Sequence, residues 1–187
     1  MDALAADILD FWFGDRAGAR DVWFRKDAAF DDVIRARFGA AVDAAVGGAF
    51  AEWTAHPAGA LAVVLLVDQF TRNLFRDTPR MFSGDARALA VADSAVAAGF
   101  DRALAPLERW FLYMPFEHAE DLAAQDRSIA LFTRLVDETG LAAPLEWAEK
   151  HATVVRRFGR YPHRNAMLGR PSTPDEVAFL AEPGSRF

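Results

Sequence analysis

The densest group of residues that could do chemistry lies near the C-terminal end, from His151 to Arg170. This run holds five arginines and two histidines with no Asp or Glu, and contributes +5 to a chain whose net charge is −6. A guanidinium group needs water, a carboxylate or an anionic ligand, because burying an unpaired cation is costly. We therefore predict an anion site within this run, with Arg160, Arg164 and Asn165 as ligand contacts.

Two histidines are the candidates for proton transfer. His163 lies in a proline-fixed turn between two arginines, whose charge would lower its pKa and keep the ring neutral as a base or donor. His118 would act as a general acid or base if a carboxylate such as Glu120 oriented it. The structural alternative is that Glu120 is a first-turn helix residue and that His118 has no chemical role.

A second group of polar residues follows the most apolar segment of the chain. Asp68, Arg72 and Arg76 are spaced at i, i+4 and i+8, with Asn73 alongside, so a helix would stack them on one face. Gln125 is a polar residue on the apolar stripe of a later helix. These residues form either a second wall of the same pocket or an intrahelical Asp–Arg pair on a solvated face.

The arginines also have possible partners within the chain. Four acids lie close together without a base among them, at Glu117, Glu120, Asp121 and Asp126. An internal ion-pair network could absorb the whole basic run, although exposed pairs contribute only about 0.2 to 1 kcal/mol each. The sequence leaves open whether these acids neutralise the arginines or act with them.

Composition excludes several other classes of site. The chain has no cysteine and its four histidines are scattered, so we expect no disulfide and no metal site. No glycine-rich phosphate loop indicates a nucleotide cofactor, and we expect no cofactor of any kind. A net charge of −6 argues against nucleic-acid binding. The longest apolar run, residues 60–67, is too short to cross a membrane, and with no leader-like segment we expect a cytoplasmic protein.

Helical periodicity recurs along the chain and predicts the elements that position these residues. Gly and Pro residues separate the predicted helices. We expect Asp27 to be a helix N-cap, Pro115 to end a helix, and Thr173 to begin a capping box. We expect an all-α fold of about eight helices in a single domain, residues 1–187. The predicted helices are residues 4–13, 28–46, 61–76, 85–98, 106–114, 119–138, 145–158 and 174–180.

Several sequence blocks resemble one bacterial family, domain-of-unknown-function family 924. The blocks are Asp68-Gln69-Phe70-Thr71-Arg72-Asn73, the segment from Glu108 to Pro115 leading to His118 and Glu120, and the run from Phe158 to Asn165. The resemblance implies a helical fold similar to tetratricopeptide-like superhelices and no established activity. Where the family often has Ser between the His and the Glu, this chain has Ala119, which argues against a serine nucleophile there.

Two functional hypotheses follow. In the first, the predicted site residues converge on a pocket that binds a small anionic molecule, with metal-independent hydrolytic chemistry in which His163 or His118 moves the proton. In the second, a tetratricopeptide-like groove clamps an acidic peptide or a terminal carboxylate as an adaptor. The sequence does not indicate the oligomeric state.

Overall fold

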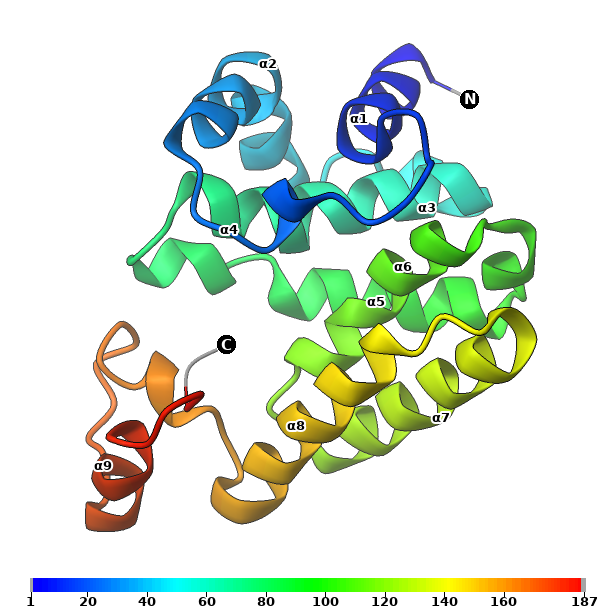
Figure 1. The fold of residues 1–187 in the computed structure, drawn as a ribbon. Helices are drawn as coiled ribbons and strands as arrows, with labels where there is room; N and C mark the ends of the chain where they lie inside the picture. Colours follow the sequence, from blue (N-terminus) through cyan, green and yellow to red (C-terminus); the bar gives the residue numbers. More distant parts are fainter. Residues whose placement is uncertain (1, 186–187) are drawn as a thin grey trace.

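The protein is described here by a computed structural model that covers residues 2–185. This part of the chain is helical and contains no strand, which confirms the predicted all-α fold class (Figure 1). The α-helices are α1 (Ala3–Phe13), α2 (Ala28–Val46), α3 (Pro57–Val64), α4 (Thr71–Leu74), α5 (Asp85–Ala97), α6 (Pro106–His118), α7 (Leu122–Thr139), α8 (Ala143–Phe158) and α9 (Pro174–Leu180).

The helix ends follow the predicted capping chemistry. Asp27 accepts a hydrogen bond from the Phe30 amide at the start of α2, and Thr173 accepts one from Glu176 in a full capping box at α9. Gly159 has a φ of +70° at the C-cap of α8, a left-handed conformation that favours glycine. Local sequence therefore fixes where these three helices begin or end.

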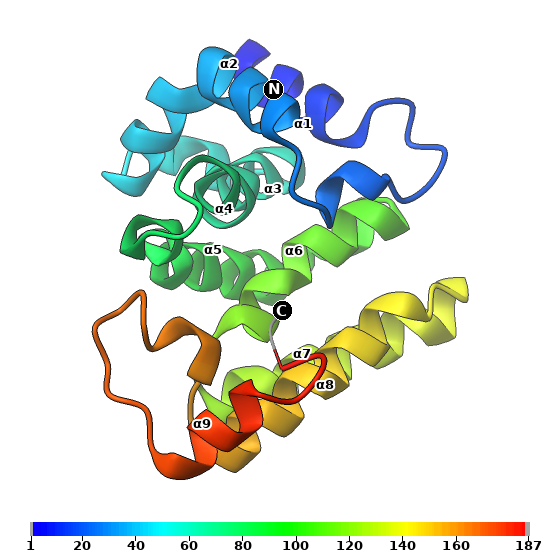
Figure 2. The same ribbon diagram turned by 60° about the vertical axis from the view of Figure 1, so that its left-hand side comes forward.

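One helical rod runs through the middle of the upper part of the molecule. It consists of α3, a π-helical segment η3 (Leu65–Phe70) and α4. Every residue from 59 to 71 is buried, as expected for a helix that is apolar all round. Helices α1, α2, α5 and α6 pack around it, so the apolar run 60–67 lies in the core (Figures 1 and 2).

The later helices form a second group of packed elements. Helix α7 packs along both α6 and α8, and α9 packs against the short 3₁₀ helix η6 (Pro162–Arg164) (Figure 2). One apolar cluster extends from α1 to α8, and a smaller one joins the end of α8 to Tyr161 and Phe179. The chain from residue 159 onward therefore folds back toward the end of α6 and the start of α5.

Two predicted boundaries are wrong. Pro115 does not end α6, which continues to His118, because α6 is buried from Arg109 to its end and packing outweighs the roughly 3 kcal/mol cost of an internal proline. Helix α7 begins at Leu122 and not at residue 119, with Asp121 as its N-cap. His118 is therefore the last residue of α6, and Glu120 lies in the turn between the helices.

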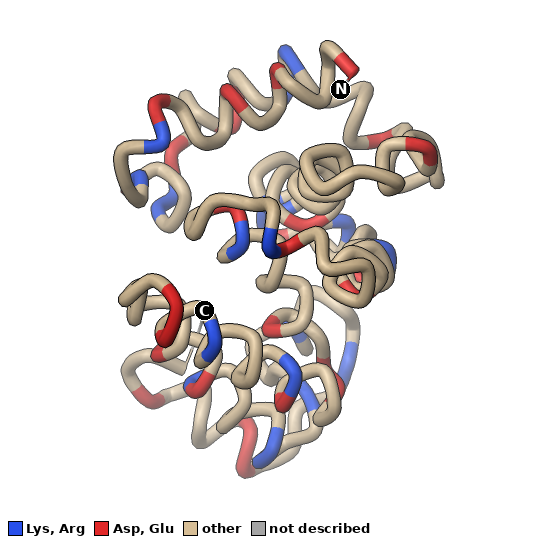
Figure 3. Tube along the Cα trace, turned by 90° about the vertical axis from the view of Figure 1, so that its right-hand side faces the viewer, with Lys and Arg blue, Asp and Glu red and all other residues tan. Residues whose placement is uncertain are grey.

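Charges of both signs are interspersed along the chain (Figure 3). The predicted basic run is accompanied in space by acids from distant segments, including Glu120 and Glu176. Among residues 2–185 no helix combines the length and apolarity needed to span a bilayer.

Candidate functional site

The π-helical segment η3 places the first residues of the site. At this widened turn the carbonyl of Val67 accepts a hydrogen bond from the Thr71 hydroxyl at 3.0 Å, and that of Asp68 accepts one from Arg72 Nη1 at 2.8 Å. The carboxylate of Asp68 is fully buried and lies 3.2 Å from Arg72 Nη1, which is the predicted i, i+4 pair. π-Helical turns are rare and occur frequently at functional sites.

Gly84 brings the start of α5 against this turn. A Cβ atom built on Gly84 would lie 2.0 Å from the Val67 carbonyl oxygen, so no larger residue fits there. The close approach places Asp85, the first residue of α5, beside Arg72. Asp85 accepts two hydrogen bonds from the Arg72 guanidinium, at 2.8 and 3.1 Å.

Asp68 also orients His118. Its Oδ1 lies 2.8 Å from Nδ1 of the imidazole, while Gln69 donates to Oδ2 at 2.6 Å. Burial alone would raise the pKa of Asp68, but the charge of Arg72 and the contact with His118 outweigh it and hold the pKa below its usual range. Burial, followed by the charge of Arg72, lowers the pKa of His118. The pair is therefore an ionised carboxylate and a neutral imidazole that donates from Nδ1 and keeps a lone pair on Nε2.

The end of α6 that carries His118 is held by residues of later segments. The amide nitrogen of Gln125 donates to the carbonyls of Glu117 and Ala119 at 2.7 Å each. The Tyr161 hydroxyl donates to the Glu117 carbonyl at 2.5 Å. These bonds satisfy carbonyls that a helix end leaves without partners, so Gln125 fixes the position of His118.

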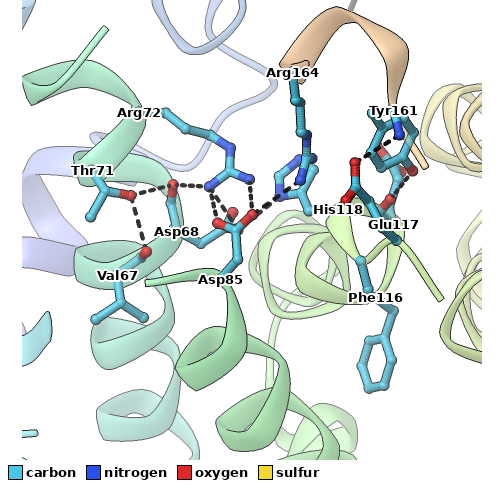
Figure 4. Close-up of polar contacts among 12 residues, drawn as sticks. Val67, Asp68, Thr71, Arg72, Asp85, Phe116, Glu117, His118, Tyr161 and Arg164 are labelled. Carbon is cyan, nitrogen blue, oxygen red and sulfur yellow. Dashed lines mark hydrogen bonds and ion pairs between the residues drawn. The ribbon is translucent and has the colours of Figure 1, made fainter. Parts of the chain in front are cut away.

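Arg164, in η6, directs its side chain toward Asp85 and His118. Its side chain is 8% exposed, and Nη1 makes a single long hydrogen bond of 3.3 Å to Asp85, within the described residues. In this part of the chain its Nε is buried and has no acceptor. Burial, followed by the charge of Arg72, lowers the pKa of Arg164. Figure 4 shows both arginines converging on Asp85, with His118 beside them.

Glu117 and His151 complete the buried group. Nδ1 of His151 lies 2.8 Å from the Trp147 carbonyl and 3.3 Å from Glu117 Oε1. Burial, followed by the charge of Asp68, raises the pKa of Glu117 to about 8. Burial lowers the pKa of His151 to about 3. We call this set the buried polar cluster: Asp68, Arg72, Asp85, Glu117, His118, His151 and Arg164.

The other predicted contacts from the basic run bind acids of the same chain. Arg160 binds Glu176 through Nε and Nη2 at 2.6 and 2.8 Å. Arg170 binds Glu120 at 2.6 and 2.8 Å, and its Nε donates to Asn165 Oδ1 at 3.0 Å. Most of this run therefore forms an internal ion-pair network, whereas Arg164 joins the buried polar cluster.

Arg157 and the paired Arg160 line a surface hollow of about 380 Å³. It is bordered by Arg157, Phe158, Arg160, Thr173, Asp175 and Glu176. Two cations and two acids balance its charge, so the hollow has no net preference for an acidic ligand. Arg160 is the one predicted anion contact among the residues that border this hollow.

The remaining predicted residues divide between the two regions. Arg76 does not stack on Arg72, because α4 ends at Leu74. Asn73, inside α4, and Arg76 both donate to Asp31 of α2, at 2.6 Å. The ring of His163, which lies in η6, is 5.6 Å from the ring of Tyr161. A proton-transfer role for His163 stays a prediction. The structure thus brings together Arg72, His118 and Arg164, with Gln125 as a support.

Comparison with known protein families shows which family the chain belongs to. Residues 8–184 match the model of a family described as bacterial protein of unknown function, DUF924. The chain belongs to the DUF924 family. It is similar to a solved structure, the protein of unknown function ATU0120 from Agrobacterium tumefaciens, with 45% identity and a TM-score of 0.87 over 96% of this chain and 97% of that one. No curated protein matches the chain.

Four members of the cluster in this DUF924 chain were not predicted as ligand or catalytic residues: Asp68, Asp85, Glu117 and His151. Tyr161, which holds the end of α6, was not predicted either. The sequence places Asp85 in the first turn of a helix, where acids are common. Glu117 is one of several acids that could pair with the arginines. Tyr161 has no distinguishing pattern. One signal was present: Gly84 directly before Asp85 indicates close backbone approach, although it does not identify the neighbour.

Proposed function

We propose that this DUF924 protein binds a small anionic ligand at the buried polar cluster and that His118 moves a proton in a hydrolytic reaction of that ligand. Arg164 and Arg72 are the anion contacts. Asp68 aligns His118, and Gln125 positions the end of α6. The proposal keeps the chemistry expected from the sequence and, of the two arginines predicted to bind the anion, retains Arg164 and not Arg160.

The single observation that carries the proposal is the pairing of Arg164. A buried guanidinium normally has acceptors for most of its five N–H groups. Arg164 instead shares Asp85 with Arg72, and its Nε has no acceptor among the described residues. An incoming carboxylate or phosphate oxygen would satisfy these donors and offset the repulsion between the two arginines.

The Asp68–His118 pair supports the proton-transfer part. A carboxylate on Nδ1 fixes the tautomer, so Nε2 is the basic atom. Nε2 makes no hydrogen bond within residues 2–185, and the side chain is 11% exposed. Because Ala119 offers no hydroxyl next to His118, the nucleophile that His118 would activate is water.

Anion binding is tested by isothermal titration with sulfate, phosphate and acetate near pH 7. Arg164→Gln is expected to weaken binding at least about tenfold, equivalent to losing one charge-assisted hydrogen bond of about 1.5 kcal/mol. The matched control is Arg156→Gln, since Arg156 binds Asp126 on the surface and its side chain is 52% exposed. Equal affinity of Arg164→Gln and wild type would contradict the proposal.

Hydrolysis is tested separately with p-nitrophenyl acetate and p-nitrophenyl phosphate. His118→Gln should lose turnover while still binding sulfate, because the arginines are retained. Activity that survives in His118→Gln would exclude His118 as the proton carrier. Binding of an acidic peptide that depends on Arg160 and not on Arg164 would instead favour the adaptor hypothesis.

A further inference from the structure

Glu117 is a second buried acid at the same end of α6. Its side chain is 4% exposed, and its main-chain carbonyl is held by Gln125 and Tyr161. Oε2 is buried and has no hydrogen-bond partner among residues 2–185. A buried polar atom without a partner is rare in folded proteins and calls for an explanation.

The neighbouring histidine shows which oxygen carries the proton when Glu117 is neutral. Nδ1 of His151 lies 2.8 Å from the carbonyl oxygen of Trp147, which only accepts, so Nδ1 carries a hydrogen. The same nitrogen lies 3.3 Å from Glu117 Oε1 without a hydrogen bond to it, and an N–H at this distance disfavours a second proton on Oε1. The acid proton then resides on Oε2, the oxygen that has no described partner.

The surroundings of Glu117 favour its neutral form. Burial removes water from the carboxyl group, and the negative charge of Asp68 opposes a second negative charge, while Arg72 acts in the other direction. Together these groups raise the pKa of Glu117 to about 8. The titratable and charged groups around it are Asp68 and Arg72 from the central rod, Asp85 from α5, His118 from α6, His151 from α8, and Glu120, Tyr161 and Arg164 from the turns.

We propose that Glu117 is the proton donor of the site, with Oε2–H directed at the bound anion and His118 as the complementary base. This inference rests on the function proposed above and narrows its substrate to an anionic ester whose leaving oxygen needs a proton. Titratable groups whose surroundings push their pKa values apart commonly divide base and acid roles in this way.

The proton balance of the reaction closes within the cluster. His118 Nε2 takes a proton from water, and the water oxygen bonds to the electrophilic carbon or phosphorus. The bond to the leaving oxygen breaks with its electron pair on that oxygen, which Glu117 protonates. The proton on His118 then passes to the Glu117 carboxylate, which restores both groups.

The test compares sulfate binding by wild type, Glu117→Gln and Glu149→Gln at pH 7 and pH 9. Sulfate is chosen because it does not change charge in this range. Wild type should bind about tenfold more weakly at pH 9, because an acid with a pKa of about 8 is mostly ionised there and repels the anion. Glu117→Gln keeps a neutral donor, so its affinity should change less than about twofold. Exposed Glu149 serves as the control and should leave the wild-type profile intact.

The outcomes separate the two proposals. If wild type binds no sulfate at either pH, both the proposed function and the role of Glu117 are overturned. If wild type and Glu117→Gln bind with the same pH profile, anion binding stands and the donor role of Glu117 is overturned.

A second measurement decides the case if Glu117→Gln does not fold. Infrared spectra of the wild-type protein between pH 6 and pH 10, with sulfate added, report the carbonyl band of a protonated carboxylic acid. We expect such a band at pH 7, its shift on sulfate addition, and its loss at high pH. A spectrum without that band, or a band that sulfate leaves unchanged, would overturn the proposal.

Discussion

Arg72 and Arg164 contact the same carboxylate but have different surroundings. Arg72 binds Asp85 through two nitrogens and also contacts Asp68, and these carboxylates raise its pKa despite the opposing effect of burial. Arg164 has one long bond to Asp85 and a lowered pKa. Arg72 is therefore the better paired of the two cations. The desolvation cost of Arg164 is offset only in part, by Asp85 and by contacts of its guanidinium with the rings of Phe82 and Tyr161.

This difference predicts unequal effects of two matched substitutions on the free energy of unfolding. Arg72→Met leaves the fully buried Asp68 and the half-buried Asp85 without their shared cation and should cost about 3 kcal/mol or more. Arg164→Met removes an under-paired cation and should lie within about 1 kcal/mol of wild type, on either side. Urea unfolding monitored by circular dichroism measures both. An equal loss in the two variants would mean that Arg164 is as well paired as Arg72.

At the scale of elements, backbone features bring distant segments together. The π-helical segment η3 directs Asp68 toward α6, and α6 continues past Pro115 so that His118 reaches it. Gly84 lets the start of α5 pack directly against the backbone of the same turn at Val67. The site thus depends on close packing of η3, α5 and α6 as well as on its own side chains.

Gly84→Ala tests this packing. An added Cβ would lie 2.0 Å from the Val67 carbonyl, so α5 must move away, and we expect a loss of about 3 kcal/mol in unfolding free energy. Gly39→Ala is the control, because that position is inside α2 and has no atom within 4 Å of an added Cβ. It should stabilise the protein by about 0.5–1 kcal/mol. Chemical denaturation of the two variants gives the comparison, and equal stabilities would refute the role of Gly84.

At the scale of the whole molecule, the sequence predicts the helices better than their association. Periodicity and capping residues locate α1, α2 and α9, and i, i+4 spacing predicts the Asp68–Arg72 pair, because these are local effects. The contacts of Asp85 with Arg72 and Arg164 span 13 and 79 residues, and no local pattern indicates them. The resemblance to tetratricopeptide-like folds and the single-domain organisation remain predictions.

The tertiary context also changed the predicted face of α7. Helical spacing places Leu122, Gln125 and Phe132 on one face. Leu122 is 52% exposed, whereas Gln125 and Phe132 are buried together with Ser128. The helix starts three residues later than predicted and packs between α6 and α8, so two neighbours determine its buried surface. Helical spacing alone does not define a face that two partners share.

The buried polar cluster should give the whole protein a stability maximum near pH 6.5. His118 and His151 have lowered pKa values, about 3 for His151, so their contribution is present above 6.5 and is lost as the pH falls. Glu117 has a raised pKa of about 8, so its contribution is present below the unfolded value of 4.5 and is lost as the pH rises through 8.

Between pH 6.5 and pH 8 the loss from Glu117 should total about 2 kcal/mol, at about 1.4 kcal/mol per pH unit. Glu117→Gln should show no such decline. Urea unfolding at half-unit pH intervals measures the slope. A wild-type slope that persists in Glu117→Gln would assign the titration to another group.

The central claim is that Arg164 is the open cation of the site, and side-chain NMR tests it most directly. The Nε–H resonances of the arginines are followed in ¹⁵N-labelled protein during a sulfate titration at pH 7. The Arg164 resonance should shift and become protected from exchange, because Nε gains an acceptor. The Arg160 resonance should stay unchanged, because its Nε already donates to Glu176 at 2.6 Å. A shift of Arg160 without Arg164, or of neither, would contradict the account.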